Sequence, residues 1–171
     1  MSALPTLTLT TLLLLILAAT CYAQDLIQIT LPTPGQTITS KTQLDISYTV
    51  IGAQTLSPAP VNATYPSSMT AQFEWLAKGT QNDPLALSAL GGMNTRHYAA
   101  GIQNKEYTNS WNVPNCHFFS RYNPSNYDFR LVFTPVYKTE LPGEEQQSDH
   151  QQQPIVIPLT VQVNNATYPK C

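Results

Sequence analysis

The chain has 171 residues, only 11% of them charged, and a formal net charge of −2 at pH 7. It lacks a basic patch, so we expect no nucleic-acid partner. An unbroken apolar run from Leu12 to Ala19 opens the sequence, but it is shorter than the roughly 20 apolar residues needed to cross a bilayer. Because the small residues Cys21 and Ala23 follow this run, we interpret residues 1–23 as a cleaved secretory signal peptide.

The remainder, residues 24–171, has the length of a single domain and contains no second apolar stretch of membrane length. We therefore expect a secreted protein, extracellular or associated with a cell wall, with no membrane segment in its mature form.

Alternating apolar and polar residues predict β-strands rather than helices in this domain. In residues 43–52, for example, Leu44, Ile46, Tyr48 and Val50 share one face of the predicted strand. Five segments have a clear strand pattern and two have a weaker one. They are 25–32, 43–52, 69–77, 127–137 and 153–163, with 96–102 and 106–114 as the weaker pair. About seven short strands predict two packed sheets in a β-sandwich, with a small barrel as the alternative.

Two longer connections separate these strands. We expect residues 79–93 to form a loop with a short helical turn after Asp83. Residues 138–153 are polar and rich in glutamine, which predicts a mobile loop. Pro135 and Pro158 fall inside strand patterns, so at least one of the last two strands should be kinked or lie at a sheet edge.

The sequence NATYP occurs twice, from Asn62 to Pro66 and from Asn165 to Pro169. Each copy contains an Asn-X-Thr acceptor triplet, so we predict N-glycosylation at Asn62 and Asn165. The residues around the two copies differ, which argues against a repeated domain.

Two cysteines, Cys116 and Cys171, remain after removal of the signal peptide. In an oxidising compartment they most simply form one disulfide within the chain, and an intermolecular bond is the alternative. The intramolecular bond would close a loop of about 55 residues and stabilise the fold by about 4 kcal/mol.

Residues that could form a catalytic or metal site are scarce. His97, His117 and His150 are far apart in the sequence, and Glu74 lies on the polar face of its predicted strand. No hydrolase, zinc or phosphate-binding motif is present. We therefore expect no enzymatic activity, no metal and no cofactor; a secreted hydrolase is the least favoured reading.

Aromatic residues crowd around Cys116, in the segment from Ser110 to Phe133. We interpret Trp111 and Tyr127 as packing residues, and Trp75 as core. Some of the other residues could instead bind a ligand, because flat apolar rings with polar neighbours suit a sugar. These candidate ligand-binding residues are His117, Arg121, Tyr122 and Asn123, and for His117 and Tyr122 the structural interpretation stays open.

Two parts of the sequence resemble the N-terminal domain of the fungal killer-toxin-resistance family of cell-wall proteins. They are ITLPTPGQTITSKTQLDISYTV, with its Pro-Gly turn before a strand, and SWNVP followed by YDFRLVF. The resemblance implies an immunoglobulin-like sandwich in a fungal wall or secreted protein associated with β-glucan assembly. It implies no catalytic residues.

These features together predict a secreted, non-catalytic glycoprotein that is a structural or carbohydrate-binding component of a cell wall or extracellular matrix. Its expected partner is a wall polysaccharide such as β-glucan. The alternative is a secreted module, similar to an effector or an adhesin, that binds another extracellular protein.

Overall fold

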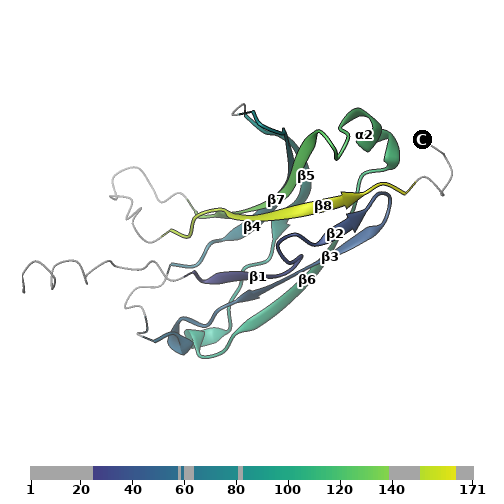
Figure 1. The fold of residues 1–171 in the computed structure, drawn as a ribbon. Helices are drawn as coiled ribbons and strands as arrows, with labels where there is room; N and C mark the ends of the chain where they lie inside the picture. The colour runs from purple at the N-terminus through teal and green to yellow at the C-terminus, as the bar shows by residue number, and fades with distance from the viewer. Residues whose placement is uncertain (1–24, 58, 60–63, 81–82, 139–150, 165–171) are drawn as a thin grey trace, which may run out of the picture.

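Two β-sheets pack face to face in the computed structural model, which describes residues 25–57, 59, 64–80, 83–138 and 151–164 (Figure 1). The smaller sheet has the strand order β1 (Ile27–Leu31), β3 (Gln43–Val50), β6 (Lys105–Asn112). The larger sheet has the order β2 (Thr37–Thr39), β8 (Ile155–Gln162), β7 (Tyr127–Val136), β4 (Ser68–Ala77), β5 (Leu85–Met93). The predicted all-β sandwich is thus confirmed, with eight strands among the described residues instead of about seven.

The order of the strands is that of an immunoglobulin-like sandwich. In that fold the A, B and E strands share one sheet, and the G, F, C and C′ strands share the other. Here β1, β3 and β6 take the first set of places and β8, β7, β4 and β5 the second. All pairs are antiparallel except β2 with β8, which run parallel.

Side-chain alternation explains the core between the sheets. On β3, the residues with even numbers from Leu44 to Val50 are buried, and on β4 the residues with odd numbers from Met69 to Trp75 are buried. Phe73 lies at the centre of the core. Its ring contacts five other aromatic rings, those of Trp75, Trp111, Phe118, Phe119 and Phe129. The prediction that Trp75 and Trp111 are packing residues is therefore confirmed.

Two predictions of local structure were wrong, and one helix was not predicted. Residues 79–93 do not form a loop with a helical turn after Asp83, because Leu85–Met93 is the strand β5. Residues 96–102 do not form a strand, and a short 3₁₀ helix, η2 (Ala99–Gly101), lies there instead. The sequence also gave no sign of α2 (Cys116–Arg121), which joins β6 to β7.

Pro135 and Pro158 lie in strand stretches that have a neighbouring strand on one side only, so the absence of their N–H leaves no ladder partner unpaired on the other side. Pro158 pairs with Arg130 on one side, and on its other side β2 begins to pair only at Thr160. Pro135 has a partner on β4, but the pairing of β7 with β8 ends at Phe133. Neither β7 nor β8 is an outermost strand of the sheet, but each proline lies in a stretch that pairs with a neighbouring strand on one side only.

The side chain of Gln152 covers the backbone of β1. Its Oε1 accepts a hydrogen bond from the N–H of Ile27 at 2.9 Å, and its Nε2 donates to the Ile27 carbonyl at 2.7 Å. The N–H of Gln152 donates to the hydroxyl of Tyr137 at 2.9 Å. The end of the predicted mobile loop 138–153 is therefore anchored to the sandwich, and residues 139–150 lie outside the described residues.

Candidate functional site

The short helix α2 forms one corner of the molecule, at the end of β8 (Figure 1). Asn115 caps it, because its Oδ1 accepts a hydrogen bond from the N–H of Phe118 at 3.2 Å. Cys116, at the first position, is buried and disulfide-bonded, and Phe119 is buried against Phe73. A helix of six residues is too short to be stable alone, so the cap, the disulfide and the packing of Phe119 fix its position.

Four aromatic rings cluster beneath and beside α2. The rings of Phe118 and Tyr122 lie 5.0 Å apart, and each lies 4.9 Å from the ring of Trp75. Tyr127, at the start of β7, meets Tyr122 edge-on at 5.5 Å. We call Trp75, Phe118, Tyr122 and Tyr127 the α2 corner cluster. Trp75 is buried, whereas the other three members are half-buried, so the cluster runs from the core to the surface.

One polar atom in this cluster has no partner. The indole Nε1 of Trp75 is buried and makes no hydrogen bond, and it is the sole buried side-chain nitrogen or oxygen of that kind in the described part of the chain. A buried donor without an acceptor costs about 1–3 kcal/mol. Such groups are rare in folded proteins and call for an explanation.

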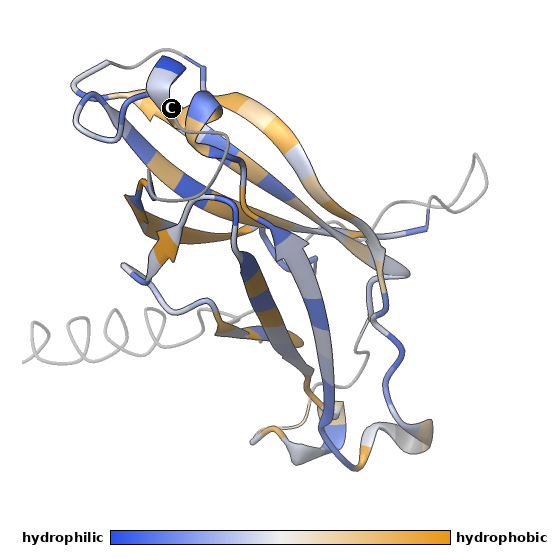
Figure 2. Ribbon diagram, turned by 90° about the vertical axis from the view of Figure 1, so that its right-hand side faces the viewer, coloured by the Kyte–Doolittle hydropathy of each residue, from blue (hydrophilic) through white to orange (hydrophobic). Residues whose placement is uncertain are grey.

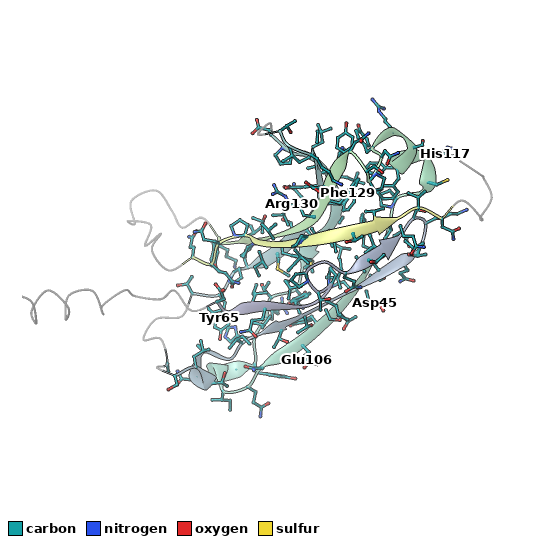
Figure 3. All side chains as sticks on the ribbon, in the orientation of Figure 1. Asp45, Tyr65, Glu106, His117, Phe129 and Arg130 are labelled. Atoms are coloured by element: carbon teal, nitrogen blue, oxygen red, sulfur yellow. The ribbon has the colours of Figure 1, made fainter. Side chains whose placement is uncertain are left out.

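The solvent side of α2 carries two exposed cationic or titratable residues. His117 and Arg121 are four residues apart, which places them on the same helix face. The guanidinium carbon of Arg121 lies 5.6 Å from the centre of the Tyr122 ring, within the range of a cation–π contact. Figure 3 shows His117 at this outer corner. Three of the four predicted ligand-binding residues therefore lie together.

The fourth, Asn123, has a turn role. Its Oδ1 accepts a hydrogen bond from the N–H of Ser125 at 2.9 Å, and its carbonyl accepts one from Asn126 at 2.8 Å. This arrangement directs the chain from α2 into β7.

A second aromatic cluster, which the sequence analysis missed, lies at the opposite end of the sandwich. The Nζ of Lys105 lies 5.2 Å from the ring centre of Tyr98 and 5.0 Å from that of Tyr107. The Tyr107 hydroxyl donates to the carbonyl of Arg96 at 2.7 Å, and 46% of Tyr98 is exposed. We call Tyr98, Lys105 and Tyr107 the lysine–tyrosine cluster. The sequence signal was the spacing of Lys105 and Tyr107, which puts them on the same face of β6.

The histidines occupy separate places. The ring of His97 stacks on that of Tyr65 with centroids 3.8 Å apart, and Figure 3 shows Tyr65 at the end of the sandwich opposite His117. His150 lies outside the described residues. In the described ranges, no three His, Cys, Asp or Glu side chains form a group that could hold a metal ion.

Several predicted features fall outside the described residues. These are the signal peptide 1–23, the glycosylation sites Asn62 and Asn165, and the cysteine Cys171. Pairing of Cys116 with Cys171 and modification of the two asparagines therefore stay predictions. The described residues contain no helix that is long and apolar enough to cross a membrane.

No protein family matches the sequence of this chain, and no characterised protein does so. The resemblance to the fungal killer-toxin-resistance family stays a prediction.

Proposed function

We propose that this chain is a secreted, non-catalytic glycoprotein that binds a polysaccharide of a cell wall or extracellular matrix through the α2 corner cluster. The observation that carries the proposal is the unpartnered indole N–H of Trp75 beneath the half-buried rings of Phe118 and Tyr122. Aromatic faces stack on the apolar faces of sugar rings, and sugar hydroxyls accept hydrogen bonds. A sugar hydroxyl is an acceptor of the kind that this indole N–H lacks.

The surroundings of the cluster fit a neutral or weakly acidic sugar. Arg121 is exposed beside the Tyr122 ring, and His117 is exposed on the same helix face as Arg121, so both can supply hydrogen-bond donors. The disulfide at Cys116 and the cap at Asn115 hold α2 in place, so little conformational entropy would be lost on binding.

The test is retention of the purified protein on insoluble β-glucan, chitin and cellulose. We expect retention on at least one polymer, weakened at least about tenfold by Tyr122→Ala. Arg121→Ala should give a smaller loss, and because Arg121 is exposed this variant should melt at the wild-type temperature. Unchanged retention in both variants would place the site elsewhere, and no retention of the wild type would argue against the carbohydrate proposal.

A second candidate function is recognition of another extracellular protein through the lysine–tyrosine cluster. Tyrosine is enriched at protein interfaces, and Tyr98 is exposed beside a cation at the end of the sandwich opposite α2. Tyr98→Ala therefore serves as the matched control for Tyr122→Ala. It should leave polysaccharide retention unchanged if the α2 corner binds sugar, and should abolish binding to a cell surface if this second function is correct.

The secretory part of the proposal has its own test. In a eukaryotic secretion host, Asn62→Gln and Asn165→Gln should each remove the mass of one glycan from the exported protein. An exported protein of unmodified mass would contradict the glycoprotein proposal and leave the polysaccharide assay unaffected.

A further inference from the structure

Strand β5 is the outermost strand of the larger sheet and pairs only with β4. One row of its backbone N–H and C=O groups therefore faces outward. Its sequence, LALSALGGM, contains no charged residue and no proline. In Figure 2 it is the mostly apolar ribbon at the right-hand margin of the upper sheet.

The inner face of β5 extends beyond the smaller sheet. Leu85 is the cross-strand partner of Trp75, and Leu87 is the partner of Phe73, so both leucines point to the same side as these buried rings. Nevertheless 51% of Leu85 and 42% of Leu87 are exposed. The smaller sheet has three strands against five, and it leaves this part of β5 uncovered.

The other sheet edges in the described structure are protected in ways that β5 is not. Gln152 occupies the outward N–H and C=O of Ile27 on β1. Strand β6 begins with the charged residues Lys105 and Glu106, and β2 is only three residues long. Short length, charges and covering groups are the usual means of preventing edge-to-edge pairing.

We propose that β5 pairs with β5 of a second copy of this chain, antiparallel and across a twofold axis. The two larger sheets then become one continuous sheet. Cross-strand partners must point to the same face, so the register centred on Ala86 sets Leu85 of one copy opposite Leu87 of the other. The four leucines of the pair then cover one another, and every outward backbone group in that stretch gains a partner.

A second copy fits this edge better than a charged partner would. Because β5 carries no charged residue, pairing it with a second β5 places no like charges opposite each other. The twofold symmetry also brings the apolar face of one copy against the same apolar face of the other. The outer face of the strand in this stretch carries only the small side chains of Ala86 and Ser88.

The pairing should also be weak. The ladder between β4 and β5 is regular only from Leu85 to Ser88 and shifts register beyond that point. A short strand pair buries less than the surface of a standard stable interface, so we expect a dimer that dissociates in the micromolar range.

Sedimentation velocity from low micromolar to several hundred micromolar protein tests the proposal. The wild type should shift from monomer to dimer, and Leu87→Lys should weaken dimerisation at least about tenfold, because it introduces a charge at the paired face. Val156→Lys is the matched control. Val156 is 47% exposed on β8, three strands from the β5 edge, so this variant should dimerise like the wild type.

A monomeric wild type at every concentration, or an equal loss in both lysine variants, would overturn the proposal. If Leu87→Lys fails to fold, Leu85→Lys makes the same change at a more exposed position.

Cross-linking tests the register. Ala86→Cys should form a disulfide-linked dimer under mild oxidation, because the two copies of residue 86 would face each other with their Cβ atoms about 5 Å apart. Ser88→Cys, two residues away on the same face, should cross-link at least about tenfold more slowly. Faster cross-linking of Ser88→Cys would reject the register centred on Ala86. Ala86 and Ser88 pair with Glu74 and Gln72 on the outer face of β5, the face opposite Trp75, and the assay contains no polysaccharide, so its outcome is scored separately from polysaccharide binding.

Discussion

Arg130 on β7 holds the carboxylate of Glu74 on the neighbouring strand β4. Its Nη2 lies 2.7 Å and its Nε 2.8 Å from the same oxygen, Oε2. The two residues are direct cross-strand partners on the outer face of the larger sheet, and only 9% of Glu74 is exposed. The Glu74 side chain is 12% exposed and the Arg130 side chain 38%, so removing Arg130 would leave a carboxylate with little access to water, whereas Arg130 itself is partly solvated.

Substitution of Arg130 by Gln should lower the free energy of unfolding by about 1–2 kcal/mol, because it leaves Glu74 without its cation. Combining it with Glu74→Gln should cost less than the sum of the two single changes, by about 1 kcal/mol. Urea unfolding followed by tryptophan fluorescence measures all three variants. Additive losses would show that the two side chains do not stabilise each other.

Substitution of Gln152 by Glu should destabilise the protein at pH 7 by about 2–3 kcal/mol, because a carboxylate cannot donate to the Ile27 carbonyl. Burial should raise the pKa of the new carboxyl above its usual value of about 4.3. If the carboxyl has a higher pKa in the folded protein than in the unfolded chain, its protonated form contributes full stability at pH values below the unfolded-state pKa. That contribution is lost as the pH rises through the folded-state pKa. The deficit relative to the wild type should therefore shrink as pH falls toward about 4.

Gln151→Glu is the control for that variant, since Gln151 is adjacent in sequence and exposed. Thermal melts of both variants between neutral pH and about pH 4 make the comparison. A deficit for Gln152→Glu that stays constant with pH would contradict the role of the amide donor at Ile27.

Substitution of Gly52 by Ala should cost more than about 2 kcal/mol or prevent folding. A Cβ at this position would lie 2.5 Å from the Gly101 carbonyl oxygen and 2.7 Å from that of Gln103, and both contacts are with backbone. Gly91→Ala, with nothing within 4 Å of its added Cβ, should change stability by no more than about 0.5 kcal/mol. Equal melting temperatures for the two variants would mean that the backbone near Gly52 shifts enough to accommodate the added Cβ at little cost in stability.

Substitution of Tyr48 by Phe removes a hydroxyl that donates to the Asn94 carbonyl at 2.8 Å, and should cost about 1 kcal/mol at pH 7. Burial raises the pKa of the Tyr48 phenol. The folded protein then keeps this proton when the unfolded chain has lost it, so wild-type stability should fall as pH rises above about 10.

The Tyr48→Phe variant should lose stability less steeply over that alkaline range. Urea unfolding at neutral pH and at about pH 11 measures the difference. Tyr98→Phe, on an exposed tyrosine, should behave as the wild type does. If Tyr48→Phe does not change how steeply the free energy of unfolding falls with pH above about 10, the alkaline loss of stability comes from other groups.

Much of the fold could be predicted from local patterns. The alternation in residues 43–50, 69–77 and 127–133 identified three central strands, because a strand with one buried face must alternate whatever its partners are. The aromatic segment around Cys116 also identified the neighbourhood of the α2 corner cluster. In contrast, β5 escaped prediction. Its leucines are half exposed and its end is rich in glycine. The segment therefore has no regular alternation of apolar and polar residues from which its pairing with β4 could be predicted.

The sequence by itself determined which strands have an apolar face, where the cysteines and sequons lie, and that the chain carries little charge. Only the tertiary structure decided which polar side chains meet. Gln152 bonds Ile27 across 125 positions, and Arg130 bonds Glu74 across 56. Strand order also decided which edge is left open, because β5 pairs on one side only and its Leu85 and Leu87 side chains are exposed. Burial of an apolar face needs only a local period, whereas hydrogen-bond partners and sheet edges depend on residues that the fold brings together from distant parts of the chain.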